Sequence, residues 1–216
     1  MPPTRKQPAR TAKTSPVSSG GKSANPLLAS QQFGEFENRR QIPSDIQDHL
    51  LTLYTWGRGW TSALGGTVIE LGVRSGNSTS AFLAAIEVDR KGALYSCDIN
   101  TPDVPPYWHD LDYWHFFHGD CLGPRALAWM PKQCDILFVD VDPHSYAQTL
   151  EICEKYVPKI RYGGVALFHD TDLPNAWVGD RVSGPADALD KYCELHSSLE
   201  WKNIPGCHGL GVMRIR

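Results

Sequence analysis

The feature that most constrains the fold is an alternation, after residue 44, of short β-branched runs with longer helical stretches. Strand-like runs occupy 67–71, 93–98, 115–118, 135–140 and 165–169, and stretches with helical spacing occupy 79–88, 124–130 and 146–160. This alternation is typical of parallel strands joined by right-handed crossovers. A helix at 185–197 precedes two further strands, 199–204 and 209–215, which Pro205-Gly206 separates as an antiparallel hairpin. The prediction is an α/β domain with a doubly wound, seven-stranded, mostly parallel sheet and helices on both faces.

The chain divides into two parts of different composition. Residues 1–30 are rich in Pro, Ser and Thr, and the first 25 carry five basic side chains and no acidic one. Such a segment buries little apolar surface, so we expect a disordered basic tail. Residues 31–216 form the predicted domain, which is long enough to fold without a disulfide bond or a structural metal. The spacing of Ser44-Asp45-Ile46-Gln47 is that of a capping box, which predicts a helix opening the domain.

Composition excludes several classes of protein. The whole chain has a net charge of −3, so the part beyond the basic tail is acidic, which argues against extended binding of nucleic acid. The six cysteines contain no C-x-x-C pair, and no run of about 18 apolar residues or signal peptide is visible. We therefore expect a soluble, cytoplasmic protein without membrane contact, and a homo-oligomer stays possible.

The ends of the predicted strands carry the candidate functional residues, because ligands of an open parallel sheet bind beyond the carboxyl ends of its strands. The first strand leads from Glu70 into a glycine loop, Gly72 to Gly76, which opens a helix. Arg74 stands where a dinucleotide fingerprint has glycine, which weakens a nicotinamide or flavin interpretation. The second strand ends in Asp98, 22 residues past Gly76, where a carboxylate can accept both hydroxyls of a ribose.

Asp120, which follows the third strand, is placed to accept a hydrogen bond from an adenine amino group. Together with the segments 138–146 and 163–170, these strand ends resemble class I S-adenosylmethionine-dependent methyltransferases. The resemblance covers about residues 44–216 and is closest to the small-molecule O-methyltransferase branch, which includes cephalosporin-hydroxylase-like enzymes and macrolide or aminocoumarin sugar methyltransferases. It implies a Rossmann-like fold and methyl transfer from S-adenosyl-L-methionine to a hydroxyl of a small polar metabolite.

The resemblance also implies roles for individual residues. The carboxylate and glycine loop after strand one would hold the methionine end of the cofactor, the acid ending strand two the ribose, and the acid after strand three the adenine. Carried onto this sequence, the cofactor-binding residues are Glu70, Gly72, Gly76, Ser78, Asp98 and Asp120. The flat ring of Trp108 is a candidate for stacking on adenine.

Many relatives bind Mg²⁺ through an acid ending strand four and two groups ending strand five. By position these are Asp140, His169 and Asp170, with Asp142 as an alternative ligand. The metal, Mg²⁺ or Mn²⁺, would activate the substrate hydroxyl, which gives Asp140 a catalytic role. The imidazole of His169 departs from the usual carboxylate. It indicates either a transition metal or a general base acting without metal.

His144, on the loop after strand four, is a second catalytic candidate, because an imidazole there can take the proton of a substrate hydroxyl. The alternative is that it braces the following helix, just as Asp142 can serve as a helix cap. Two other functions stay open at this point: a non-catalytic module that binds S-adenosylmethionine or a nucleotide, and a methyltransferase that acts on a macromolecule.

Overall fold

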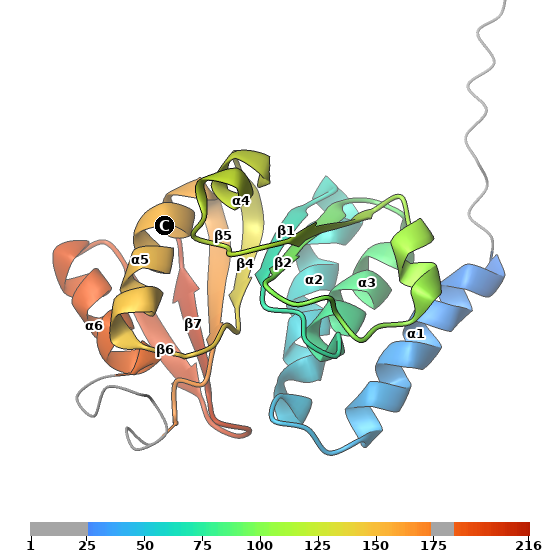
Figure 1. The fold of residues 1–216 in the computed structure, drawn as a ribbon, viewed down its shortest axis with the longest axis horizontal. Helices are drawn as coiled ribbons and strands as arrows, with labels where there is room; N and C mark the ends of the chain where they lie inside the picture. The colour runs from blue at the N-terminus through green and yellow to red at the C-terminus, as the bar shows by residue number, and fades with distance from the viewer. Residues whose placement is uncertain (1–25, 174–183) are drawn as a thin grey trace, which may run out of the picture.

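A seven-stranded sheet forms the centre of the computed structural model, which describes residues 26–173 and 184–216 (Figure 1). The strand order is β3-β2-β1-β4-β5-β7-β6, and β7 runs antiparallel to both of its neighbours while the five strands from β1 to β5 are parallel. The predicted fold class is confirmed. The strands are β1 (Thr67–Leu71), β2 (Ala93–Asp98), β3 (Trp114–His118), β4 (Cys134–Val139), β5 (Ile160–His169), β6 (Glu200–Ile204) and β7 (Leu210–Arg214).

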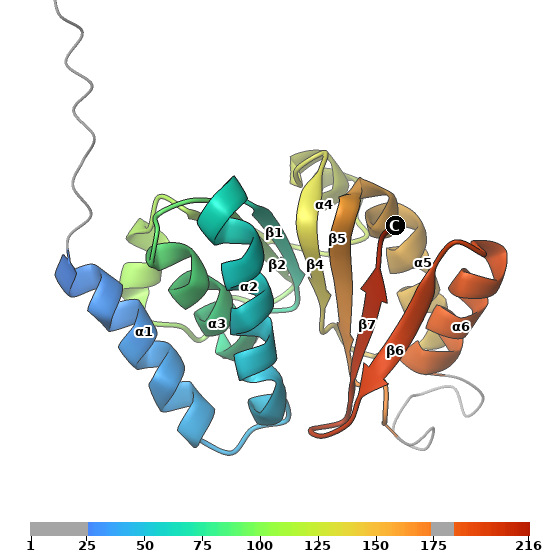
Figure 2. The ribbon, with the colours of Figure 1, turned by 180° about the vertical axis from the view of Figure 1, so that it is seen from behind.

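Helices cover both faces of the sheet (Figures 1 and 2). Strand side chains alternate between the faces, so Ile136 and Phe138 of β4 join one core while Leu137 and Val139 join the other. The first core contains side chains of α1 (Pro26–Gln41), α2 (Leu50–Leu64) and α3 (Asn77–Glu87). The second contains side chains of α4 (Pro124–Trp129), α5 (Tyr146–Tyr156) and α6 (Pro185–Leu195). Short 3₁₀ helices lie at Gln47–His49, Pro106–Asp110 and Val157–Lys159. No helix of the described residues is long and apolar enough to span a membrane.

The start of the domain differs from the prediction. Helix α1 was not predicted, and it begins at Pro26, inside the segment assigned to the tail; the rest of that segment, residues 1–25, lies outside the described residues. The ring of Phe36 anchors α1 by stacking on Tyr54 of α2 at 4.9 Å. The predicted capping box is wrong. The Ser44 hydroxyl is buried without a hydrogen-bond partner, and α2 begins only at Leu50, after a 3₁₀ turn.

The predicted helix at 146–160 ends earlier, at Tyr156, and β5 already begins at Ile160. Gly163 and Gly164 therefore lie inside a strand instead of ending a helix. They form a bulge, because β5 advances from Ile160 to Val165 while the partner strand advances only from Cys134 to Ile136. A side chain at position 164 would meet the Asp135 carbonyl oxygen at 2.6 Å, so packing requires this glycine. Gly163 has space for a Cβ, but its φ of +85° favours glycine.

Candidate active site

The carboxyl ends of the five parallel strands open into one cavity of about 590 Å³. Its walls come from the loops after β1, β2, β3, β4 and β5. Of the residues singled out from the sequence, those that line it are Gly72, Asp98, Asp120, Asp140, Asp142, His144 and Asp170. Glu70, Gly76, Ser78 and His169 do not line it. The sequence analysis missed Asp45, which reaches the cavity from the connection between α1 and α2.

The two glycines of the loop after β1 are required by neighbouring protein atoms. Gly72 has φ +93°, and a Cβ there would lie 1.8 Å from the Asp140 carbonyl oxygen, so the ends of β1 and β4 touch. Gly76 has φ +77°, and its Cβ would lie 2.7 Å from the ring of Trp108. Trp108 is fully buried in the core and does not line the cavity, so its predicted place beside adenine is wrong.

Asp98, at the end of β2, holds the glycine loop in place. Its Oδ2 accepts hydrogen bonds from the backbone N–H groups of Val73 and Arg74, at 2.8 and 2.9 Å. Its Oδ1 accepts one from the N–H of Asn100, at 2.8 Å. A carboxylate offers about four acceptor positions, so the protein's own backbone uses most of them. Asp98 therefore shapes the cavity wall and keeps limited capacity for a ligand.

The wall beside Asp98 continues into the loops after β2 and β3. Asp120 is exposed, and its Oδ1 accepts a hydrogen bond from the Leu122 N–H at 2.9 Å. Ile99, which was not predicted, lines the same wall with 63% of its surface exposed. An exposed apolar side chain in the same cavity as two aspartates offers a surface suited to the face of a base.

Glu70 lies beneath the glycine loop and is fully buried. Three hydroxyls donate to its carboxylate: Ser78 at 2.7 Å, Thr79 at 2.9 Å and Ser96 at 2.6 Å. Burial raises the pKa of Glu70 to about 7, although these hydrogen bonds partly offset the effect. Glu70 and Ser78 thus join the start of α3 to β1 and β2 from below the cavity floor.

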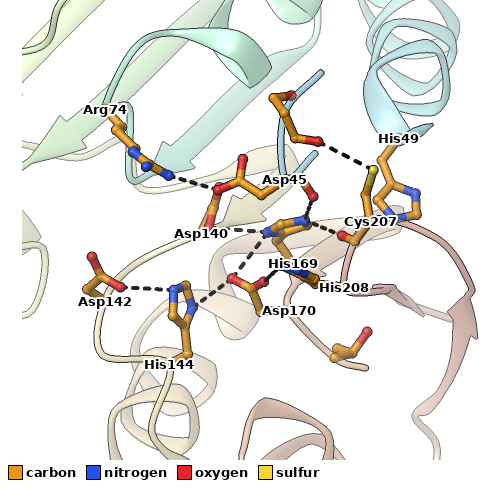
Figure 3. A network of polar contacts seen from close by, with 12 residues as sticks. Asp45, His49, Arg74, Asp140, Asp142, His144, His169, Asp170, Cys207 and His208 are labelled. Carbon is orange, nitrogen blue, oxygen red and sulfur yellow. Dashed lines mark hydrogen bonds and ion pairs between the residues drawn. The ribbon is translucent and has the colours of Figure 1, made fainter. Parts of the chain in front are cut away.

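At the other end of the cavity, carboxylates and imidazoles gather after β4 and β5 (Figure 3). Asp140, His144 and Asp170 offer three potential ligand atoms within 4.8 Å of one another. His144 Nδ1 lies 3.1 Å from Asp170 Oδ2, and its Nε2 lies 3.1 Å from Asp142 Oδ1. His144 is thus part of this cluster, and the structure does not place it as a brace of α5, whose cap is the Ser145 hydroxyl.

His169 is buried behind this cluster, with only 1% of its side chain exposed. Its Nε2 lies 3.0 Å from the Asp45 carbonyl oxygen and 2.9 Å from that of Cys207, so this nitrogen carries a proton and donates it. Its Nδ1 lies 3.4 Å from Asp140 Oδ1 and 3.2 Å from Asp170 Oδ2, yet it makes no hydrogen bond. Burial opposes a charge on the ring, but the two carboxylates outweigh it and raise the pKa of His169 to about 11.

His208, on the turn between β6 and β7, was not predicted as a site residue. Its Nδ1 lies 3.2 Å from Asp170 Oδ1 (Figure 3). The turn is held in place from behind, because His49 Nε2 donates to the Gly206 carbonyl oxygen at 2.6 Å. Burial works to raise the pKa of Asp170, but the neighbouring histidines His169, His144 and His208 outweigh it and lower that pKa below its usual value.

The backbone also marks this region. Non-glycine residues with positive φ are costly and concentrate at functional sites. Among the described residues there are six, and five of them contribute to the cavity or its surroundings: Arg74, His144, Asp170, Cys207 and His208. An ion pair of 2.8 Å between Arg74 and Asp45 joins the glycine loop to the connection that holds His169.

Comparison with known proteins supports the predicted resemblance. Residues 69–171 match the model of a family described as a methyltransferase domain, so the predicted resemblance to methyltransferases is confirmed. No curated protein sequence matches the chain.

Solved structures share the fold at low sequence identity. An O-methyltransferase from Bacillus cereus, solved in complex with S-adenosylhomocysteine, is 12% identical with a TM-score of 0.56, over 93% of this chain and 95% of that one. CalS11, a TDP-rhamnose 3'-O-methyltransferase of calicheamicin biosynthesis, is 20% identical with a TM-score of 0.58, over 88% and 93%. MycE, a methyltransferase of the mycinamycin pathway, is 16% identical with a TM-score of 0.64, over 86% of this chain and 54% of MycE. These likenesses show the Rossmann-like fold of methyltransferases.

Proposed function

From the methyltransferase domain at residues 69–171, we propose that this chain transfers the methyl group of S-adenosylmethionine to a hydroxyl of a small polar molecule, assisted by a divalent metal. The observation that carries the proposal is the single cavity. It connects Asp98 and Asp120, which suit an adenosine, to the cluster of Asp140, His144 and Asp170, which suits a metal and an acceptor. A methyl donor and an acceptor that meet in one enclosure need little more than orientation to react.

The charge of the cavity supports a cationic cofactor. Seven aspartates line it, and Arg74 is the one basic side chain among the described lining residues apart from histidine. The sulfonium of S-adenosylmethionine and a divalent metal are both cations, so an acidic lining favours both. Gly72, which touches the end of β4, places the glycine loop next to the acids after β4.

The donor set fits a divalent metal. Two carboxylates and an imidazole nitrogen within 4.8 Å are groups that divalent ions bind, and Asp140, Asp170 and His144 would hold the ion. When bound, the metal would lower the pKa of a coordinated hydroxyl. His144 Nε2 also lies 3.1 Å from Asp142 Oδ1, a contact that orients the imidazole ring at the edge of the cluster. Asp140 and Asp170 orient the acceptor end of the site.

The acceptor class is proposed from the neighbours. CalS11 is a methyltransferase of a nucleotide sugar, and MycE was solved with Mg, S-adenosylhomocysteine and mycinamycin VI. Both act in pathways of small molecules, which supports a small polar acceptor here. We propose action in the cytoplasm, without nucleic acid or membrane as partners, and a homo-oligomer is compatible with this function.

The test is a turnover assay. The purified chain is incubated with S-adenosylmethionine, Mg²⁺ or Mn²⁺, and a panel of nucleotide sugars, glycosylated macrolides and catechols, and S-adenosylhomocysteine and methylated products are detected by mass spectrometry. We expect one acceptor class to gain the mass of one methyl group, and we expect Asp140→Asn to lose this activity. A chain that binds S-adenosylhomocysteine but methylates nothing would be a non-catalytic module, and methylation of a nucleic acid or protein alone would contradict the proposed acceptor.

A further inference from the structure

The last turn of helix α1 reaches the glycine loop of the cavity. Helix α1 packs against α3, the helix that the glycine loop opens (Figure 2). The guanidinium group of Arg39 donates two hydrogen bonds from Nη1, one to the Ser75 carbonyl oxygen and one to Asn77 Oδ1 at 3.2 Å. Ser75 lines the cavity, and Asn77 is the first residue of α3. One side chain of α1 therefore joins the end of the glycine loop to the start of α3.

The Arg39 side chain is itself held in place. Its Nε donates to Glu35 Oε1 at 2.9 Å, and only 15% of the side chain is exposed. Its guanidinium carbon lies 5.3 Å from the centroid of the Trp108 ring, within the range of a cation–π contact. Gly76 approaches the same ring, because a Cβ there would lie 2.7 Å from it. The glycine loop and Arg39 therefore share the buried ring of Trp108 as a common support.

The two halves of the glycine loop have different supports. Asp98, at the end of β2, accepts hydrogen bonds from two backbone N–H groups of the first half. The carbonyl oxygen of Ser75, in the second half, accepts from Arg39. Asp98 lies within the residues that match the family model, 69–171, whereas Arg39 lies outside them. Without the Arg39 side chain, the second half of the loop would lose its side-chain anchor and gain backbone freedom.

We propose that Arg39 is a positioning residue for the cofactor, which holds the Ser75 end of the glycine loop ready for the amino-acid part of S-adenosylmethionine. Arg39 is not among the described residues that line the cavity, so it acts through Ser75 and Asn77. A loop that is already ordered binds more tightly, because it loses less backbone freedom when the ligand arrives. The inference rests on the proposed function, since it takes the adenosyl cofactor as the ligand of this cavity.

The test compares two ligands of the full chain by calorimetry in the presence of chelator. S-adenosylhomocysteine carries the amino-acid part, and 5'-methylthioadenosine has the same adenosine and sulfur without it. In Arg39→Met, we expect S-adenosylhomocysteine to bind about 5- to 30-fold more weakly, because binding must then order roughly one residue of the loop. The affinity for 5'-methylthioadenosine should stay within about twofold of the native value, since this ligand lacks the part that meets the loop.

The neighbouring arginine provides the matched control. Arg40 also lies in the last turn of α1, pairs with Glu37 at 3.6 Å and lies over the ring of Phe36, and both of these partners belong to α1. Arg40→Met should therefore bind both ligands as the native chain does. Arg39→Lys should recover part of the affinity for S-adenosylhomocysteine, because an ammonium group can donate to a carbonyl oxygen but lacks the planar fork of a guanidinium.

The outcomes separate this inference from the proposed function. Unchanged affinity of Arg39→Met for S-adenosylhomocysteine would overturn the inference, and so would an equal loss for both ligands, which would indicate a general structural fault. If Arg39→Met does not fold, Glu35→Gln makes the same comparison. It removes the carboxylate that orients Arg39 and should weaken S-adenosylhomocysteine selectively, by less than Arg39→Met would. A folded native chain that binds neither ligand would reject the inference together with the proposed function.

Discussion

The carboxylates at the two ends of the cavity have different kinds of partner. At the end proposed for the cofactor, which we call the cofactor end, Asp98 accepts hydrogen bonds from three backbone N–H groups. Beneath it, the buried Glu70 accepts hydrogen bonds from three hydroxyls of the protein. At the other end, Asp170 and Asp140 face imidazoles, and His169 Nδ1 makes no hydrogen bond although it is buried. At the first end, hydrogen bonds within the protein already fix the carboxylates. At the second end, the carboxylates and imidazoles can still accept a bound cation.

This difference shows which interactions determine the shape of each end of the cavity. Hydrogen bonds from backbone groups hold the cofactor end, so its shape follows from the sheet and the glycine loop. The cluster depends on side chains from three segments and on backbone conformations with positive φ at His144, Asp170 and His208. Such conformations cost of order 1–3 kcal/mol each and persist where the surroundings enforce them.

Replacing Gly72 tests the point at which the two ends meet and has the largest expected effect. The Cβ of Gly72→Ala would lie 1.8 Å from the Asp140 carbonyl oxygen at φ +93°, so the free energy of unfolding should fall by more than about 4 kcal/mol. Urea denaturation followed by circular dichroism measures it. Gly59→Ala, in α2 with no atom within 4 Å of its Cβ, is the control and should gain up to about 1 kcal/mol. A loss below 1 kcal/mol in Gly72→Ala would contradict the close contact.

Removing the charge of Asp170 separates the two ends. Asp170→Asn should weaken Mn²⁺ binding by more than about a hundredfold, because even outer partners of a metal are worth about 10- to 100-fold. Its affinity for S-adenosylhomocysteine in chelator should stay within about twofold, since the cofactor end keeps its own hydrogen bonds. Calorimetry measures both. Asp110→Asn, an exposed aspartate at the end of the 3₁₀ helix Pro106–Asp110, is the control. An equal loss of affinity for Mn²⁺ and for S-adenosylhomocysteine would show that the two ends of the cavity do not bind independently.

The buried acid of the cofactor end makes stability depend on pH. The pKa of Glu70 is raised from 4.5 to about 7, so folding favours its protonated form. The contribution of Glu70 to the free energy of unfolding is fully present below about pH 4.5. It is lost as the pH rises towards 7, and the loss is on the order of 3 kcal/mol. The free energy of unfolding of Glu70→Gln relative to the native chain should therefore rise over this window and level off above it. A difference that does not change with pH would contradict the raised pKa, and Glu151→Gln is the exposed control.

The ion pair between Arg74 and Asp45, which links the two ends over the surface, should matter least. Its side chains are 82% and 38% exposed, so Asp45→Asn should change the free energy of unfolding by less than about 1 kcal/mol, and by less still in high salt. Urea denaturation at two salt concentrations measures this. A loss of several kcal/mol would mean that the pair holds the ends together.

The contrast between the ends also explains what the sequence could predict. Asp140 and Asp170 follow strands that pair as neighbours, with Val139 opposite Phe168. Strand patterning placed both acids at strand ends, and the resemblance to methyltransferases supplied their grouping. The glycine loop and Asp98 follow from the same logic on β1 and β2. The predicted cofactor roles of all six residues remain predictions. Three of these residues, Glu70, Gly76 and Ser78, lie under the loop or in the core and not on the cavity wall.

Other parts depend on tertiary contacts that leave little trace in the sequence. His208 reaches Asp170 because β7 pairs with β5, with Leu210 opposite His169, and hairpin signals do not reveal which strand the hairpin joins. Helix α1 escaped prediction because few of its side chains are apolar and it depends on contacts such as that of Phe36 with Tyr54. Ser44 has capping-box spacing, but the chain there turns through a 3₁₀ helix instead.

The central claim is that the backbone-held end of the cavity binds the adenosyl cofactor, and calorimetric titration with S-adenosylhomocysteine in the presence of chelator tests it most directly. We predict saturable binding at one ligand per chain, weakened in Asp98→Ala by about 1.5–3 kcal/mol because a charged hydrogen-bond partner is lost. The control Asp112→Ala, whose side chain is 84% exposed, should bind as the native chain does. Absence of binding by the folded native chain, or equal binding by Asp98→Ala, would contradict the account.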